Sequence, residues 1–283
     1  MKKSVSVIIP VFNRLENFKS AVLSVIEQTF NNFELIVVDD GSDPHYGDGI
    51  NGFLDQLKDT RIKLIVNNSN QGVSSARNIG ILESNGDNIA FLDSDDQWIR
   101  NKLKIQTDYF RDNPLIRVVH TEEIWVRNGV RVNQKKIHKK SGGDIFKGSL
   151  ERCLISPSAV MLRKDIFNDY GYFDTNLPAC EDYDLWLRIT AFEQVGFIED
   201  PMIIKFGGHF DQLSTKYPAM DIFRCRSLMS VINNIHIDYK RRCMALEVFN
   251  RKSEILYQGA VKRGNNLIID EIIKLRESII GNL

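Results

Sequence analysis

The sequence predicts an α/β protein with a mostly parallel central sheet flanked by helices and a helical extension at its C-terminal end. Short apolar runs alternate with segments of helical periodicity through the first 115 residues, which is typical of strand–helix–strand units. These runs are apolar at successive positions, which indicates strands buried on both faces. From about residue 219 onwards, apolar residues recur at helical spacing. The length of 283 residues suits one large domain with an appendage.

The first 115 residues contain four expected strands and four expected helices. Asn13 stands three residues before Glu16, which is close to a capping box and favours a helix start there. Residues 43–52 are rich in glycine and aspartate and are expected to form a loop. The expected strands are 5–9, 35–38, 62–66 and 89–92. The expected helices are roughly 15–28, 53–58, 74–83 and 98–111, the last closed off by Pro114.

The pattern changes after Pro114, where residues 118–126 and 129–132 predict an antiparallel hairpin. The basic run 133–143 favours a solvated loop, with contact to an anionic partner as the alternative. Further expected elements are strands at 155–162, 195–198 and 202–206, and a helix that starts near Glu181 and carries an Asp184–Arg188 pair.

The expected domain organisation follows this change in pattern. We expect one domain over 1–218, with a ligand-binding part at 1–115 and a second part at 116–218, and a helical extension over 219–283. The apolar stripes of the extension favour core packing or homo-oligomer contact, and docking on a membrane is the weaker alternative.

Composition excludes several classes of function. Acids and bases balance at 37 each, so no strong field draws the chain to nucleic acid. The cysteines are widely spaced and form no CxxC pair, which favours reduced thiols in a cytosolic protein; they are Cys153, Cys180, Cys225 and Cys243. The N-terminal apolar run is short and is interrupted by Pro10, so we expect a cytoplasmic protein whose membrane contact is at most peripheral, at the inner face.

Acidic residues follow two of the expected strands directly. The run 89–92 leads into Asp93, Asp95 and Asp96, and the run 35–38 leads into Asp39 and Asp40. Buried carboxylates need neutralisation, and Mg²⁺ or Mn²⁺ shared with substrate phosphates provides it. The alternative is an acidic turn that caps the next helix, and the stretch 91–96 alone favours neither reading.

Position along the chain separates these alternatives. The polar segments 10–14, 39–43, 67–77 and 93–96 all come after expected strands. In parallel sheets ligands bind beyond the carboxyl ends of the strands, so this coincidence favours a site for metal and phosphate. No GxGxxG follows the first strand and no GxxxxGK[ST] occurs, and Trp98 and Lys104 occupy the EF-hand positions that require Gly and Glu.

Two further features suggest a functional role, and each also has a purely structural explanation. Glu181 and Asp182 stand at the start of an expected helix, where a carboxylate either caps the helix or acts on a substrate. His209 follows Gly207 and Gly208, and a lone histidine there is either a surface residue or part of a loop over a site.

Five segments taken together resemble a known family. They are VSVIIPVFNR, LIVVDDGSDP, NQGVSSARNIG, FLDSDDQW and CEDYDLWLRI, and they occur in this order. The set resembles the inverting nucleotide-sugar glycosyltransferases of family 2, and the resemblance covers roughly residues 4–215. It implies the GT-A fold, a Rossmann-like α/β sheet flanked by helices.

The resemblance implies roles for individual residues. Residues matching the nucleotide-sugar site are Pro10, Phe12, Arg14, Asp40, Arg77, Asp93, Ser94 and Asp95. Of these, Asp40 matches the acid that hydrogen-bonds the base, and Asp93 with Asp95 matches the DxD motif. Residues matching the Mn²⁺ or Mg²⁺ site are Asp95, Asp96 and His209. Asp182 matches the general base, and Glu181 and Trp186 are expected on the acceptor side.

The implied activity is metal-dependent, inverting transfer of a sugar to a hydroxyl group. The implied donor is a nucleoside-diphosphate sugar, with UDP favoured, and the implied acceptor is a saccharide or a lipid-linked saccharide in bacterial surface-glycan synthesis. A nucleotidyltransferase is the rival enzyme class, although the segment 10–14 lacks the glycine-rich loop such enzymes use. A catalytically silent nucleotide-sugar-binding subunit is the rival outside the enzymes.

Overall fold

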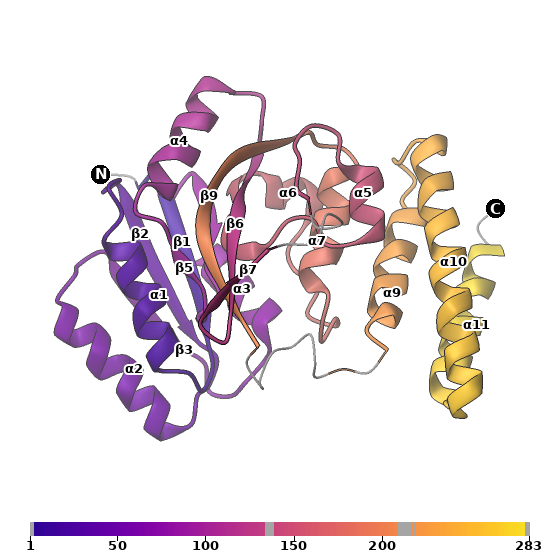
Figure 1. The fold of residues 1–283 in the computed structure, drawn as a ribbon, viewed down its shortest axis with the longest axis horizontal. Helices are drawn as coiled ribbons and strands as arrows, with labels where there is room; N and C mark the ends of the chain where they lie inside the picture. The colour runs from indigo at the N-terminus through magenta and orange to yellow at the C-terminus, as the bar shows by residue number, and fades with distance from the viewer. Residues whose placement is uncertain (1–2, 134–138, 209–216, 218, 281–283) are drawn as a thin grey trace.

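The computed structural model describes residues 3–133, 139–208, 217 and 219–280. Within these residues one nine-stranded sheet forms the centre of the molecule (Figure 1). The strand order is β3-β2-β1-β4-β8-β6-β9-β5, and β7 pairs with β6.

The first four strands of this order are parallel, as predicted. They are β1 (Val5–Val11), β2 (Phe33–Asp39), β3 (Ile62–Val66) and β4 (Asn88–Phe91). Helices α1 (Glu16–Ile26), α2 (Pro44–Leu57) and α4 (Lys102–Asp112) share one core cluster with Val7 and Leu35. Helix α3 (Val73–Leu82) shares the other cluster with Ile8 and Ile36. Neighbouring strand residues therefore face opposite layers, which explains the continuous apolar runs.

The second half of the sheet is mixed in direction. Its strands are β5 (Gln97–Trp98), β6 (Val118–Arg127), β7 (Val130–Val132), β8 (Met161–Arg163) and β9 (Val195–Gly207). β8 is antiparallel to β4 and β6, β5 is antiparallel to β9, and the predicted β6–β7 hairpin is antiparallel. β9 runs parallel to β6, with register shifts at Thr121–Glu122–Glu123. These shifts let one strand span the two segments that the sequence predicts separately.

Several local predictions are wrong, and each has a physical reason. Helix α2 covers the predicted loop because Pro44 suits a first helical turn and Ile50 and Leu54 are buried against the core. Residues 97–98 pair with β9 as strand β5, so helix α4 begins only at Lys102. Asn13 has φ +47° and exchanges hydrogen bonds with Asp43, so it does not cap α1.

The predicted strand at 155–162 is shorter than expected. A 3₁₀ turn at Pro157–Ala159 precedes β8. The remaining helices before the extension are α5 (Phe146–Glu151), α6 (Ile166–Tyr170) and α7 (Glu181–Thr190), and α7 begins where it is predicted to begin. The predicted Asp184–Arg188 ion pair is present in α7, with 2.8 Å between the charged atoms.

Two glycines permit close backbone approaches. Gly41 follows β2 with φ +72°, and a Cβ atom there would stand 2.5 Å from the Ser69 carbonyl carbon. A Cβ atom on Gly80 would stand 2.5 Å from a side-chain carbon of Ile8, so this glycine lets α3 pack closely on β1.

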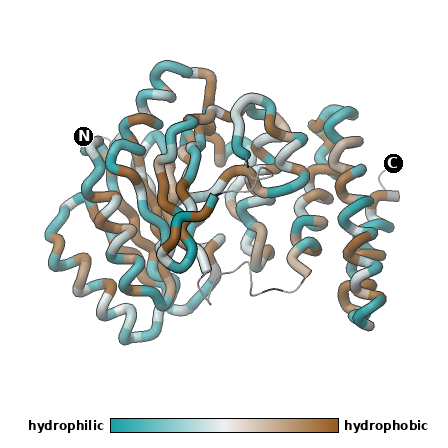
Figure 2. The backbone as a smooth tube through the Cα atoms, in the orientation of Figure 1, coloured by the Kyte–Doolittle hydropathy of each residue, from teal (hydrophilic) through white to brown (hydrophobic). Residues whose placement is uncertain are grey.

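The C-terminal helices stack side by side at the end of the molecule opposite to α2 (Figure 1). They are α9 (Asp221–Ile232), α10 (Tyr239–Arg263) and α11 (Asn266–Ile280). α9 packs on α7, and a hydrophobic cluster joins Tyr183 and Leu187 to Cys225 and Leu228. Figure 2 shows hydrophobic stretches in the sheet and alternating character along these helices. In the described part of the chain, no helix is both long and apolar enough to cross a bilayer.

Candidate functional site

The three acids after β4 lie at the carboxyl edge of the parallel strands. Asp95 forms an ion pair with Arg14, which follows β1, at 2.7 Å. Burial and the nearby Asp93 raise the pKa of Asp95 above its usual value, against the opposing charge of Arg14. Ser94 is buried between the two acids. The loops that follow β1 and β4 are thus held together by charge.

Arg77 joins this cluster to the second acidic pair. Its side chain is 4% exposed, and its two terminal nitrogens lie 2.7 Å from Asp93 and 2.7 Å from Glu181. Burial alone would lower the pKa of Arg77, but the two carboxylates raise it. Helix α3 therefore presents one buried guanidinium that holds the β4 loop against the start of α7.

Asp96 is tied into the protein at both of its oxygens. The Ser158 hydroxyl donates to Oδ2 at 2.6 Å, and the Phe206 amide donates to Oδ1 at 3.2 Å. Burial raises the pKa of Asp96 well above its usual value, and Asp95 and Asp93 add to this while Lys205 opposes it. Ser158 also accepts from the Asp93 amide at 3.1 Å. Asp96 thus links β4, the turn before β8 and strand β9.

Asp40 organises the loop between β3 and α3. Its oxygens accept from Asn67 Nδ2 at 2.8 Å, from the Gln71 amide at 3.1 Å and from the Gly72 amide at 2.7 Å. Asp39 accepts from the Ser42 amide at 3.0 Å and holds the loop after β2. Both carboxylates shape the edge of the sheet where a nucleotide base is predicted.

The remaining predicted nucleotide residues differ in exposure. Pro10 is buried within β1, whereas Phe12 directly after that strand is 44% exposed. A large aromatic ring exposed beside a polar edge is available for stacking.

Glu181 and Asp182 open helix α7. Glu181 is 6% exposed, and burial and the charge of Asp182 raise its pKa, with Arg77 opposing. The Tyr183 amide donates to Asp182 Oδ1 at 2.6 Å, and the Cys153 thiol donates to Asp182 Oδ2 at 3.3 Å. Burial and Asp182 raise the pKa of Cys153 well above its usual value, which keeps the thiol a donor.

A buried charge network on β6 and β9 was missed by the sequence reading. Lys140 forms an ion pair with Glu123 of β6, and the Trp125 indole donates to Glu123 at 2.7 Å. Burial would raise the pKa of Glu123, but the charges of Lys140 and Lys205 lower it to about 2. The signal for this network was a set of charged residues inside strands, Glu123 in β6 and Lys205 in β9.

Trp186, which is expected on the acceptor side, is buried in the core. Trp186 is 1% exposed and packs edge-on against Phe173, with 6.2 Å between ring centroids. The acceptor-side role of Trp186 stays a prediction. His209 lies outside the described residues, so its predicted metal role stays a prediction.

The carboxylates suit a hard divalent cation in their chemistry. No set of three or more His, Cys, Asp or Glu side chains gathers as a metal site among the described residues. Mg²⁺ and Mn²⁺ at phosphate sites commonly use one or two carboxylates, with phosphates and water completing the shell. Asp95 engages Arg14 through Oδ2, and Asp93 engages Arg77 through Oδ1. These two acids therefore fit such a cation once a diphosphate supplies further oxygens.

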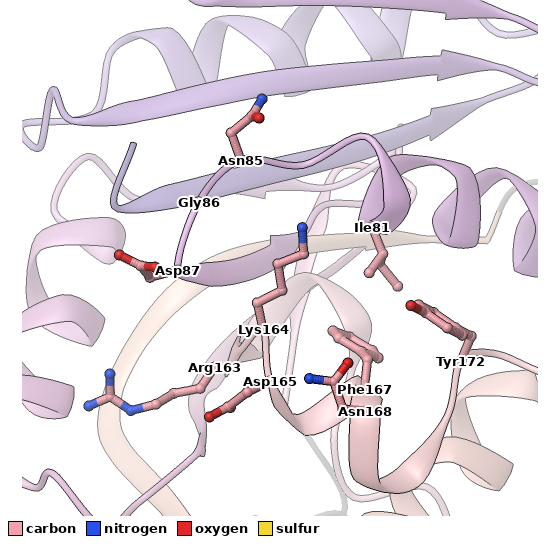
Figure 3. Close-up of a pocket in the computed structure, with 10 residues that line it drawn as sticks. All are labelled: Ile81, Asn85, Gly86, Asp87, Arg163, Lys164, Asp165, Phe167, Asn168 and Tyr172. Atoms are coloured by element: carbon pink, nitrogen blue, oxygen red, sulfur yellow. The ribbon is translucent and has the colours of Figure 1, made fainter. Parts of the chain in front are cut away.

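A pocket of about 560 Å³ lies at the opposite edge of the sheet (Figure 3). It lies beside the amino end of β4 and includes Asp87, Arg163 and Lys164. None of the predicted site residues lines it, so the pocket is separate from the acidic cluster.

The parallel strands, the acids beyond them and the second acidic pair define a GT-A fold. Comparison with solved structures gives the same fold. The likeness to Staphylococcus aureus TarS residues 1–349 in complex with UDP-GlcNAc has a TM-score of 0.74 at 20% identity, covering 91% of this chain and 74% of that one. A mannosyltransferase from Pyrobaculum calidifontis, PcManGT in complex with GDP-Man and Mn²⁺, gives 0.62 at 14% identity, covering 99% and 88%.

The chain belongs to glycosyl transferase family 2, whose model matches residues 6–171. It is 34% identical over 197 residues to Escherichia coli WfgD, named a UDP-Glc:α-D-GlcNAc-diphosphoundecaprenol β-1,3-glucosyltransferase; 69% of this chain and 72% of WfgD are covered. It is 36% identical over 194 residues to an uncharacterized glycosyltransferase of Rickettsia bellii, covering 69% of this chain and 27% of the relative. The chain spans less than a third of this and two further rickettsial relatives.

Proposed function

We propose that this chain transfers a sugar from a UDP-sugar to a hydroxyl of a lipid-linked saccharide, with inversion and with a divalent cation. The observation that carries the proposal is the bridge made by Arg77 between Asp93 and Glu181. It holds the diphosphate-binding acids against the carboxylate pair that would activate the acceptor. A donor and an acceptor bound on the two sides of this bridge would meet at one place.

The donor side is proposed to consist of Phe12, Arg14, Asp40 and Asp93 with Asp95. Phe12 offers an exposed ring to the base, and Asp40 fixes the loop beneath it. UDP is favoured because WfgD is named for UDP-Glc and the TarS complex holds UDP-GlcNAc. We propose Asp95 as the direct metal ligand and Asp96 as its support, because both oxygens of Asp96 already accept protein hydrogen bonds. When bound, the cation would neutralise charge on the leaving diphosphate.

Asp182 is proposed as the general base. It stands next to Glu181 at the first turn of α7, and the Tyr183 amide and the Cys153 thiol fix its carboxylate. As the acceptor hydroxyl attacks, its proton would pass to Asp182 while the bond from the sugar to the phosphate breaks. Attack opposite the leaving group inverts the anomeric carbon. A lipid-linked acceptor is favoured by the diphosphoundecaprenol substrate in the name of WfgD.

The test is release of nucleoside diphosphate from a panel of donors. Purified protein would be incubated with a GlcNAc-diphosphate-lipid acceptor and one donor, either UDP-Glc, UDP-GlcNAc, a dTDP-sugar or GDP-Man. Each mixture would be prepared with Mn²⁺, with Mg²⁺ or with EDTA. We expect acceptor-dependent release of UDP with a metal, and a product of inverted anomeric configuration. Donor binding without release would indicate a silent binding subunit. Pyrophosphate formation from a nucleoside triphosphate and a sugar phosphate would indicate a nucleotidyltransferase.

A further inference from the structure

Lys205 is a charged residue of strand β9 to which the proposed reaction assigns no role. It lies on β9, one residue before Phe206, whose backbone amide binds Asp96. Among the described residues its ammonium donates one hydrogen bond, to the Ser156 hydroxyl at 3.2 Å, and it forms no ion pair. An ammonium has three donors, so two remain for a ligand.

The charged groups around Lys205 leave its ammonium available to bind an anion of a ligand. The charges acting on it are those of Glu123, Asp96, Asp93 and Asp182. Each of these acids already has another donor: Lys140, Ser158, Arg77 and Cys153, respectively. Burial would lower the pKa of Lys205, but the four carboxylates raise it, so the side chain stays charged. Partial burial removes water from the ammonium, and a bound anion can replace the hydrogen bonds that this water would make.

The position of Lys205 selects which anion it would meet. Asp93 and Asp96 lie on the donor side, and Asp182 lies on the acceptor side. The acceptor brings a neutral hydroxyl, whereas the donor brings a diphosphate whose charge grows as the sugar leaves. The only anionic group expected between these acids is therefore the diphosphate.

We propose that Lys205 binds a non-bridging oxygen of the donor diphosphate and stabilises the nucleoside diphosphate as it leaves. The inference rests on the proposed function and assigns a residue on β9 to its leaving group. The bond between the anomeric carbon and the phosphate oxygen breaks, and its electron pair stays on that oxygen. The acceptor proton goes to Asp182, and Lys205 keeps its own protons throughout.

The experiment compares UDP with uridine by calorimetric titration of the wild type, Lys205→Met and Lys205→Gln. Both variants should bind UDP about tenfold or more weakly, because one charge-assisted hydrogen bond to phosphate is lost. Uridine affinity should not change. The loss should persist in EDTA, because the contact is direct and needs no cation.

Lys164→Met is the matched control. Lys164 is also a half-buried lysine, its ammonium donates to the Ser84 carbonyl at 2.6 Å, and it lies at the opposite edge of the sheet (Figure 3). Its variant should bind UDP and uridine as the wild type does. Lys205→Arg should recover part of the UDP affinity and reports on the contact if the neutral variants fold poorly.

Three outcomes would overturn the inference. Unchanged UDP affinity in the Lys205 variants would remove the contact. Equal weakening of UDP and uridine would make Lys205 a support of the fold. A wild-type chain that binds none of UDP, dTDP and GDP would overturn the proposed function itself, and that result is distinct from the other two.

Discussion

Asp93 and Glu181 share one buried guanidinium, although 88 positions separate them in the chain. Each lies 2.7 Å from a terminal nitrogen of Arg77. The arrangement couples the loop after β4 to the start of α7, so stability and activity should depend on the same side chain.

Replacing Arg77 by methionine should cost about 3–5 kcal/mol in the free energy of unfolding, because two buried carboxylates lose their partner. Arg77→Lys should have a free energy of unfolding between those of the wild type and Arg77→Met, since a single ammonium does not span both acids as a planar guanidinium does. Urea unfolding at neutral pH measures the change. The control is Arg111→Met, whose exposed pairs should contribute little to the free energy of unfolding. A loss for Arg77→Met no larger than this control would contradict the structural role.

Asp182→Asn should lower kcat by about 10²–10⁴-fold and leave UDP affinity unchanged, because only proton transfer is removed.

Asp95→Ala should weaken UDP binding in Mn²⁺, because it removes the proposed metal ligand. Steady-state kinetics and calorimetric titration separate the two effects. Asp108→Asn, on the outer surface of α4, should leave both quantities unchanged. Wild-type turnover in Asp182→Asn would exclude this residue as the base.

His120 should make the fold sensitive to mild acid. The residue is fully buried, and its Nε2 lies 2.9 Å from the Ser141 carbonyl oxygen. Burial and the charge of Lys140 lower the pKa of His120 to about 3. Below about pH 6.5 the unfolded chain takes up a proton that the folded chain does not, so stability falls as pH falls. The expected loss between pH 8 and pH 5 is about 2 kcal/mol.

The measurement for His120 is the unfolding free energy of the wild type and His120→Gln between pH 8 and pH 5. The variant cannot titrate, so the difference between the two proteins should shrink as pH falls. The titration of Glu123, with a pKa of about 2, contributes mainly below this range. Parallel pH curves for the two proteins would show that His120 is not the source of the acid sensitivity.

Gly80→Ala should destabilise the fold by about 1–3 kcal/mol, because the added methyl would overlap Ile8 and push α3 away from β1. Gly52→Ala is the matched change on helix α2, where no atom stands within 4 Å of the added carbon. It should stabilise the protein by about 0.4–1 kcal/mol through a less flexible unfolded chain. The two variants should shift the denaturation midpoint in opposite directions, and a shared sign would contradict the packing argument.

The fold class was predictable because β1, β2 and β4 are buried on both faces and leave uninterrupted apolar runs. The part of helix α2 before residue 53 was predicted as a loop because Gly47, Gly49 and Gly52 lower helix propensity, whereas burial of Ile50 and Leu54 outweighs it. The antiparallel strands of the second half depend on contacts distant in sequence, which periodicity does not report.

The site was predictable only in part for the same reason. The acids after β4 and at the start of α7 stand in recognisable segments, so sequence reading reaches them. The charge of Lys205 acts on Glu123 only because β9 pairs in parallel with β6 across two register shifts. Trp186 stands beside the acidic pair in sequence, yet the helical turn directs its ring into the core.

The packing of helix α7 limits how segments could be exchanged between related chains to make chimeras. Its first turn carries Glu181 and Asp182, and its flank shares a hydrophobic cluster with α5 and α9. A chimera joined near residue 218 would set a foreign α9 against a native α7 and mismatch that shared layer. Recombination that aims to change the acceptor would therefore have to move α5, α7 and the C-terminal helices as one block.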